Sequence, residues 1–121
     1  MLNLPLPVRV YLCLEPTDMR RSFDGLCRMV RDFVGADPLS GDLFVFRSKR
    51  GDRVKLLYWD EDGFVIVYKR LEEGTFRWPT VAAGQASVVL RAAELAMLLD
   101  GIDWQKARRA RRYHRPATAP A

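Results

Sequence analysis

Three consecutive carboxylates, Asp60, Glu61 and Asp62, have the residue types of a metal-dependent catalytic centre. Enzymes that cut nucleic acid use acidic clusters to hold two divalent cations roughly 4 Å apart, so the carboxylates must converge. Successive residues of a strand point to opposite faces of a sheet, so three in a row cannot converge from a regular strand. Asp62 is followed by Gly63, and Asp-Gly is a strong hairpin signal because glycine supplies a positive φ. We therefore predict a turn here, with neither metal nor catalytic residues.

Other groups suited to catalysis or metal binding are sparse. His114 is the one histidine in the sequence, so a histidine-based triad or metal cluster would have to be built from it alone. Cys13 and Cys27 form no CxxC pair. We predict two buried free thiols in a reducing cytoplasm, in place of a disulfide or a zinc site. No cofactor is expected.

Basic residues are the more prominent group. The net charge is +5, which favours an anionic partner such as nucleic acid. Residues 1–79 hold 13 Lys and Arg against 12 Asp and Glu, whereas residues 80–121 hold 7 against 3. Six of those seven lie between Lys106 and Arg115, so the excess charge belongs to a C-terminal tail.

Two basic segments are candidates for phosphate contacts. RSKRGDRVK, residues 47–55, surrounds a glycine-containing turn. It is either a phosphate-contacting finger or only a solvated hairpin tip. The basic tail is either a non-specific nucleic-acid-binding segment or only a solubilising end of the chain. The candidates in these two segments are Arg47, Lys49, Arg50, Arg53, Lys55, Arg108, Arg109, Arg111 and Arg112.

The elements that must position these residues follow from hydrophobic periodicity. Strands are predicted at residues 8–14, 43–48, 53–59, 64–71 and 75–79, with residues 87–90 returning as an edge strand. Thr17 or Asp18 would cap a helix over residues 19–34 that Gly35 ends. Its apolar stripe would comprise Met19, Phe23, Leu26, Val30 and Phe33. A short helix starting near residue 92 would stop at Gly101.

We therefore expect an α+β fold. It is an antiparallel meander of about four to five strands packed by one amphipathic helix, plus a short C-terminal helix and basic tail. Residues 1–104 would form a single domain and residues 105–121 a basic, flexible tail. No apolar run is long enough to span a bilayer, so no membrane contact is expected.

Pairing residues 53–59 with residues 64–71 predicts two hairpin faces. The face of Val54, Leu56 and Tyr58 is the better core against the 19–34 helix. The other face interleaves cations with aromatics, including Trp59 and Tyr68, which is typical of a nucleic-acid stacking platform. The alternative is a sheet covered on both sides, with Lys and Arg stems reaching its rim.

Four stretches occur in an order and spacing that closely resembles one protein family: DMRRSFDGL, DPLSGDLFVFRSKRGDRVKLLYWDEDGF, VYKRLEEGTFRWP and LAMLLDGIDW. The family is that of the TnpB accessory proteins, encoded by the second open reading frame of IS66-type bacterial insertion sequences. The similarity runs from about Val8 to about Arg112. It implies an accessory role in moving a mobile DNA element, since strand cutting in that family is attributed to a separate, larger transposase.

The resemblance carries over no catalytic residues. Its motifs match basic positions at the predicted helix start, in the basic hairpin and in the Tyr-Lys-Arg-Leu segment. Arg91 departs from the family's usual Ser or Thr at a helix cap, which affects only how firmly the last helix starts. The matched basic positions are Arg20, Arg21, Arg47, Lys49, Arg50, Arg53, Lys69 and Arg70.

We expect a non-enzymatic transposition accessory protein of the bacterial cytoplasm, where DNA binding would bring it to the nucleoid. Its partners would be the DNA of the element ends, the larger transposase, or both, and no small-molecule substrate. Two alternatives stay open. One is a pure protein–protein adaptor that uses the aromatic sheet face, and the other is a metal-dependent nuclease.

Overall fold

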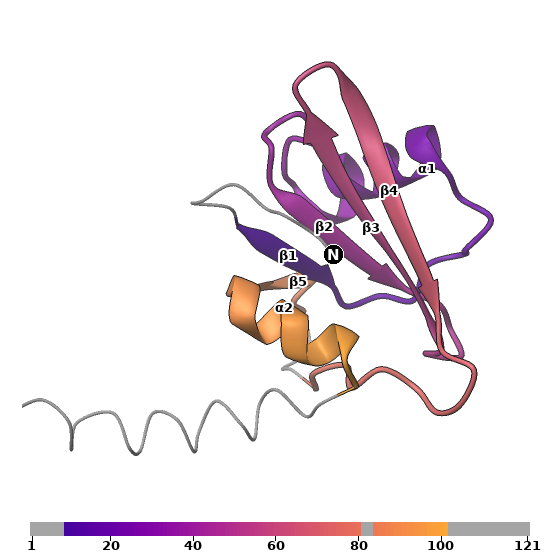
Figure 1. The fold of residues 1–121 in the computed structure, drawn as a ribbon. Helices are drawn as coiled ribbons and strands as arrows, with labels where there is room; N and C mark the ends of the chain where they lie inside the picture. The colour runs from indigo at the N-terminus through magenta and orange to yellow at the C-terminus, as the bar shows by residue number, and fades with distance from the viewer. Residues whose placement is uncertain (1–8, 81–83, 102–121) are drawn as a thin grey trace, which may run out of the picture.

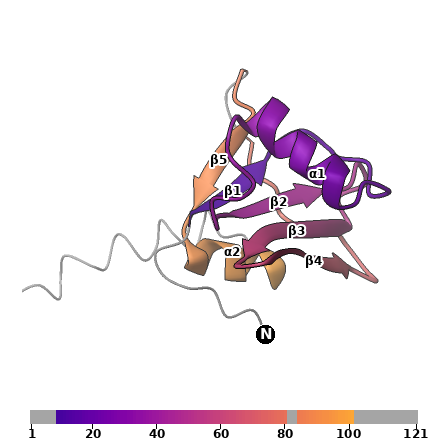
Figure 2. The ribbon, with the colours of Figure 1, turned by 90° about the horizontal axis from the view of Figure 1, so that it is seen from above.

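A mixed sheet flanked by helices organises the chain (Figure 1). The computed structural model describes residues 9–80 and 84–101. Within them the strands are β1 (Val10–Cys13), β2 (Leu43–Arg47), β3 (Arg53–Asp60), β4 (Gly63–Arg70) and β5 (Ser87–Leu90), in the spatial order β4-β3-β2-β1-β5. Helix α1 (Phe23–Met29) continues into the π-helical turn η1 (Val30–Val34), and α2 is Ala92–Leu99. The two helices lie on opposite faces of the sheet (Figure 2).

The strand connections confirm the α+β class and refine its topology. β2, β3 and β4 form an antiparallel meander through short turns, whereas β1 pairs parallel to β2 because α1 and η1 connect them. β5 pairs antiparallel to β1 and forms the other edge, as predicted. The predicted strand at residues 75–79 is wrong. That segment joins no ladder, and Phe76 and Pro79 within it are buried.

The sheet carries an apolar core on each face, as the second of the two alternatives for the hairpin predicts, although the end of β4 at Tyr68 stays exposed. Val54 and Leu56 pack with Phe76 and the leucines of α2, and Leu57 packs with α1. The prediction that the Val54 face meets the 19–34 helix is therefore wrong. Both faces carry large apolar side chains, and strand periodicity separates the faces without telling which helix covers each.

Helix α1 begins four residues later than predicted. The Arg21 amide donates to the Asp18 carbonyl oxygen at 3.0 Å, so residues 18–21 form a turn, and Ser22 is the N-cap. Leu26 and Val30 are buried, but Phe23 and Phe33 of the predicted stripe are 44% and 54% exposed. Phe23 is the first helical residue, and η1 changes the helical phase before Phe33.

Both helix ends that were predicted from glycine are confirmed. Gly35 has φ 73° and ends η1, and Gly101, with φ 79°, follows α2. At the start of α2, the Arg91 amide donates to Glu94 Oε1 at 2.8 Å. A carboxylate three residues into the helix thus satisfies the cap amide, although Arg91 replaces the usual Ser or Thr. No helix in the described ranges is long and apolar enough to cross a membrane.

Candidate nucleic-acid interface

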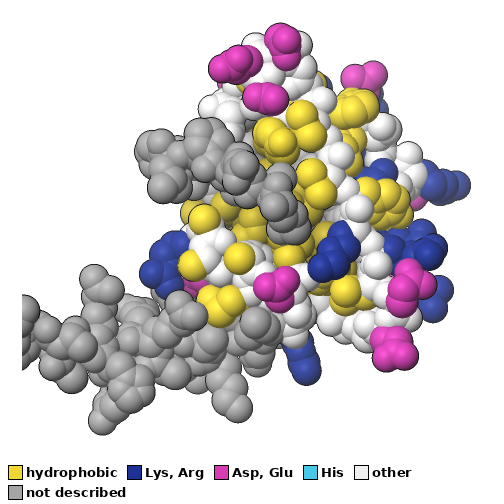
Figure 3. All heavy atoms as spheres, in the orientation of Figure 1, with side chains coloured by type: hydrophobic (Ala, Val, Ile, Leu, Met, Phe, Trp, Pro, Cys, Tyr) yellow, Lys and Arg dark blue, Asp and Glu magenta, His cyan; other side chains and the backbone are white. Residues whose placement is uncertain are grey.

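The acidic triplet lies at the tip of the β3–β4 hairpin. Asp60 pairs with Gly63, so Glu61 and Asp62 are the two turn residues, and the predicted turn is confirmed. The positive φ belongs to Glu61, at 55°, and not to Gly63 as predicted. All three carboxylates are exposed, and acidic side chains gather at that end of the molecule (Figure 3). Nowhere in residues 9–80 and 84–101 do three or more His, Cys, Asp or Glu side chains group in a way that could hold a metal.

Cys13 and Cys27 are free and buried, as predicted for the two thiols. Burial raises the pKa of each thiol above its ordinary value. The thiols therefore stay protonated at neutral pH, and a protonated thiol is a poor nucleophile.

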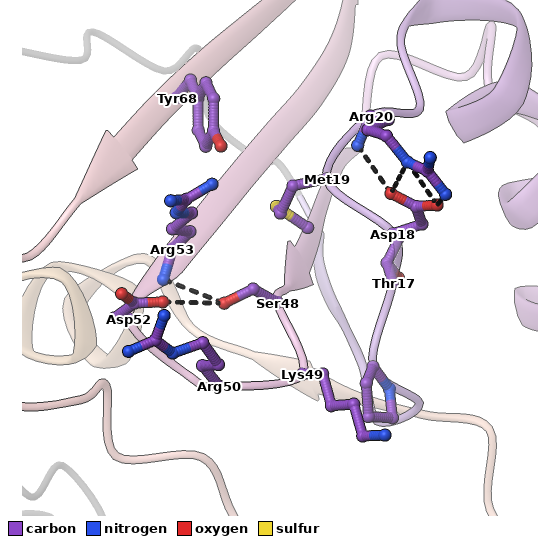
Figure 4. Close-up of a pocket in the computed structure, with 11 residues that line it drawn as sticks. Thr17, Asp18, Met19, Arg20, Ser48, Lys49, Arg50, Asp52, Arg53 and Tyr68 are labelled. Atoms are coloured by element: carbon purple, nitrogen blue, oxygen red, sulfur yellow. Dashed lines mark hydrogen bonds and ion pairs between the residues drawn. The ribbon is translucent and has the colours of Figure 1, made fainter.

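Most basic candidates of the hairpin gather at the opposite end of β3. The turn between β2 and β3, residues 16–20 and Tyr68 of β4 together line a pocket of about 780 Å³ (Figure 4). We call this the basic pocket, after its four cations. They are Arg20, Lys49, Arg50 and Arg53, and the remaining lining residues are Pro16, Thr17, Asp18, Met19, Ser48, Asp52 and Tyr68.

Backbone and side-chain hydrogen bonds order the turn that carries three of these cations. The Ser48 amide donates to the Arg53 carbonyl oxygen at 2.9 Å, and the Arg53 amide donates to Ser48 Oγ at 3.1 Å. Gly51 takes φ 83° between them. The Thr17 amide donates to the Arg47 carbonyl oxygen at 2.8 Å, which fixes the facing segment against β2. Lys49 and Arg50 are therefore presented outward from a defined turn.

The charges of the pocket are unequally neutralised. Arg20 Nη2 lies 2.7 Å from Asp18 Oδ2, and this arginine holds the pKa of Asp18 at about 2. Within the described ranges, no hydrogen bond or ion pair engages the side chains of Lys49, Arg50 or Arg53. Asp52 accepts from Ser48 Oγ at 3.3 Å. The pocket thus keeps an excess of positive charge available to an anion.

Lys55 supports the pocket from within the fold. Its side chain is largely buried, and its ammonium donates to the Arg21 carbonyl oxygen at 2.7 Å. The same ammonium lies 4.8 Å from the centre of the Tyr68 ring. Lys55 therefore positions neighbours of the pocket, and Arg21 contributes a carbonyl oxygen here while its own guanidinium is exposed.

Three other candidates hold the fold together or pair locally. Arg47 donates to the Leu14 carbonyl oxygen at 3.2 Å and lies 5.8 Å from the centre of the Trp78 ring. The Lys69 ammonium donates to the Leu99 carbonyl oxygen at 2.7 Å, where the negative end of the α2 dipole favours a cation. Arg70 pairs with Glu72 at 2.9 Å.

The two predicted stacking residues are separated. Trp59 packs edge-on against Phe64, with ring centres 5.0 Å apart, beside the acidic hairpin tip. Tyr68 lines the basic pocket, about 14 Å away along the ladder at 3.4 Å per residue. Of the two, Tyr68 alone can act together with the pocket cations. The tail candidates Arg108, Arg109, Arg111 and Arg112 lie outside the described residues.

Sequence reasoning missed the second wall of the pocket. Residues 16–20 form it, because the chain turns at Asp18 before the helix begins. The sequence pattern places Met19 in the helical stripe. Pro16 and Asp18 are both turn formers, since an Asp side chain can accept from the backbone amide two residues on, here that of Arg20.

Comparisons with known proteins cover most of the chain. Residues 8–109 match the family described as IS66 Orf2 like protein. Uncharacterized protein y4jC of Sinorhizobium fredii is 38% identical over 102 residues, which are 84% of this chain and 86% of that protein. Uncharacterized protein y4hO of the same species is 39% identical over 98 residues, or 81% and 84% of the two chains. No solved structure matches the chain.

Proposed function

This chain belongs to the IS66 Orf2-like family, and from that membership we propose a non-enzymatic accessory protein that binds its element's DNA during transposition. The family resemblance inferred from four sequence stretches is thereby confirmed. The DNA contact is our proposal, and the basic pocket is where we place it.

One observation carries the proposal: Lys49, Arg50 and Arg53 surround one pocket without a partner in the described ranges. Cations that pair with no carboxylate are free to neutralise phosphates, and the released counterions supply most of the non-specific affinity for DNA. Arg20 can add a fourth contact when a phosphate displaces Asp18. The tail between Lys106 and Arg115 would add sequence-independent affinity.

A non-enzymatic role is proposed from the chemistry that the described residues offer. The carboxylates of the triplet are exposed at a turn and form no metal-holding group within the described ranges, and both thiols are buried. We propose that the element's separate transposase cuts the strands. Supercoiled DNA incubated with the protein and Mg²⁺ or Mn²⁺ should stay intact. Cleavage that is lost in the double variant Asp60→Ala and Asp62→Ala would instead show an acidic catalytic centre.

A salt series tests the DNA contact. The binding constant for a short duplex should fall log-linearly with salt concentration, and each lost phosphate contact should reduce the slope by about one. The double variant Arg50→Glu and Arg53→Glu should bind more weakly with a shallower slope. The double variant Arg28→Glu and Arg31→Glu is the matched control, since both residues are exposed on α1 and η1 outside the pocket. Absence of binding to duplex and single strands at low salt would end the proposal.

A protein–protein adaptor is the second candidate, and exposed aromatic residues favour it. Phe23 and Phe33 on α1 and η1 are large apolar side chains that the fold leaves outside its core. Exposed aromatics are enriched at protein interfaces. This surface replaces the sheet face that the sequence suggested, because α1 covers part of that face. A pull-down of the element's transposase, with and without its terminal DNA, separates the two candidates.

A further inference from the structure

The basic pocket is an open depression of the surface, and the side chains that line it bear on the form of DNA that it takes. Its volume of about 780 Å³ falls in the range of roughly 300–1,000 Å³ that is typical of small-ligand sites. A depression of this size accommodates one unit of a chain that leaves the stack.

An aromatic ring lines one wall of this depression. Tyr68 is 50% exposed, although it lies at a ladder position directly opposite the buried Lys55. The Lys55 ammonium lies 4.8 Å from the ring centre and holds the ring beside β3. An exposed ring held in place is the feature on which nucleic-acid bases stack, and stacking tolerates any base because every base has a π-face.

Two cations of the pocket, Arg53 and Arg50, lie on the turn side of the ring (Figure 4). Arg53 is two residues from Lys55 on one face of β3, so it is a diagonal neighbour of Tyr68 across the ladder. The Arg53 side chain extends toward Tyr68, and Arg50 lies beyond it on the turn (Figure 4). Met19 projects between Tyr68 and the Asp18–Arg20 pair, and its polarisable thioether gives the depression an apolar surface.

From this arrangement we infer that the basic pocket takes one unpaired nucleotide of single-stranded DNA. The base stacks on Tyr68 beside Met19, and its phosphate lies against Arg50 and Arg53. The inference rests on the proposed DNA contact and adds to it the form of DNA that is recognised. A single strand is exposed wherever a mobile element's end is opened or its duplex is unpaired.

Fluorescence anisotropy with three probes tests the inference. The probes are a labelled thymidine 12-mer, a blunt duplex of 12 base pairs, and the same duplex with a three-nucleotide overhang. The wild-type protein should bind the single strand and the overhang several-fold more tightly than the blunt duplex. Tyr68→Leu should weaken binding to the single strand roughly tenfold and leave the blunt duplex within twofold.

Two variants control for effects unrelated to stacking. Tyr68→Phe keeps the ring and should bind the single strand within twofold of wild type. Phe33→Leu removes an equally exposed aromatic outside the pocket and should also leave binding unchanged. Equal affinity of Tyr68→Leu and wild type for the single strand would overturn the inference, and so would an equal loss for single strand and duplex.

A measurement on the wild-type protein covers the case in which Tyr68→Leu does not fold. Ultraviolet cross-linking of a 12-mer that carries 5-iododeoxyuridine, followed by peptide mass spectrometry, should place the label on Tyr68. Label found only on peptides outside the pocket would overturn the inference. Duplex binding that depends on Arg50 and Arg53 but shows no single-strand preference would defeat this inference alone. Absence of binding to all three probes would defeat the proposed function itself.

Discussion

The Lys55 ammonium lies 4.8 Å from the centre of the Tyr68 ring, directly across the β3–β4 ladder. The same ammonium donates to the Arg21 carbonyl oxygen at 2.7 Å. One largely buried cation therefore joins the segment before α1 to the strand that carries the pocket aromatic. Lys55, a candidate phosphate contact in the sequence, therefore has a structural role in the fold.

Lys55→Met should lower the free energy of unfolding by about 1–2 kcal/mol, because the Arg21 carbonyl loses a charge-assisted donor while the side-chain stem stays packed. Urea unfolding followed by circular dichroism measures this change. Lys49→Met is the matched control, since Lys49 is exposed on the turn and should change stability by no more than about 0.5 kcal/mol. Equal stability of the two variants would show that the Lys55 contacts contribute nothing.

The Asp18 carboxyl should titrate with a pKa of about 2, because Arg20 donates hydrogen bonds to both of its oxygens. The native pKa is depressed below the ordinary 3.8. The pair's contribution to stability is therefore present above pH 3.8 and is lost as the pH falls through about 2. A carboxyl-detected NMR titration measures the midpoint.

Substitution at Arg20 separates the cause of this shift from other effects. Arg20→Gln should return the Asp18 midpoint toward 3.8, whereas Arg31→Gln, on η1, should leave it near 2. A midpoint near 3.8 in the wild-type protein would show that the pair does not persist in solution. In that case Arg20 would be as available to phosphates as Lys49 and Arg50.

Glu61→Gly should stabilise the β3–β4 hairpin relative to Asp62→Gly by about 1 kcal/mol. Glu61 takes φ 55°, where a side chain is disfavoured, whereas Asp62 takes no positive φ. Both variants add the same glycine flexibility to the unfolded chain, so their difference isolates the turn geometry. Thermal unfolding of the two variants compares them. A more stable Asp62→Gly would show that the positive φ lies elsewhere in the turn.

The sequence predicted the strand faces correctly because the side-chain period of a strand is fixed. The register that pairs Leu57 with Ile66 and Leu56 with Val67 divides the hairpin as expected. The helix was less predictable, because the hydrogen-bond shift at Val30 changes its phase, and η1 moves Phe33 to the surface. No pattern in the sequence marks that shift.

The basic pocket could be predicted only in part. Lys49, Arg50 and Arg53 are neighbours along the chain, so a basic turn was visible in the sequence. Its second wall comes from residues 16–20, which meet the turn because β1 pairs parallel to β2 and the chain leaving β1 passes the end of β2. That contact depends on the topology of the sheet, which local patterns do not determine.

The exposed aromatics of the helix lead to the last prediction. Phe33→Ser should change the free energy of unfolding by no more than about 0.5 kcal/mol, because the side chain is 54% exposed and lies outside both cores. If this surface binds the element's transposase, the same variant should weaken capture of purified transposase at least fivefold and leave DNA binding unchanged. Surface plasmon resonance with immobilised transposase measures the first quantity.

Val89→Ser is the matched control for Phe33, since Val89 is an equally exposed apolar residue on another element, β5. It should leave capture of the transposase unchanged. Equal losses in both variants would indicate general apolar adhesion, and no loss in either would remove the adaptor role of Phe33. A selective loss in Phe33→Ser together with intact DNA binding would assign two separate surfaces to the protein. The basic pocket would then contact DNA, and the helix would contact the enzyme that cuts it.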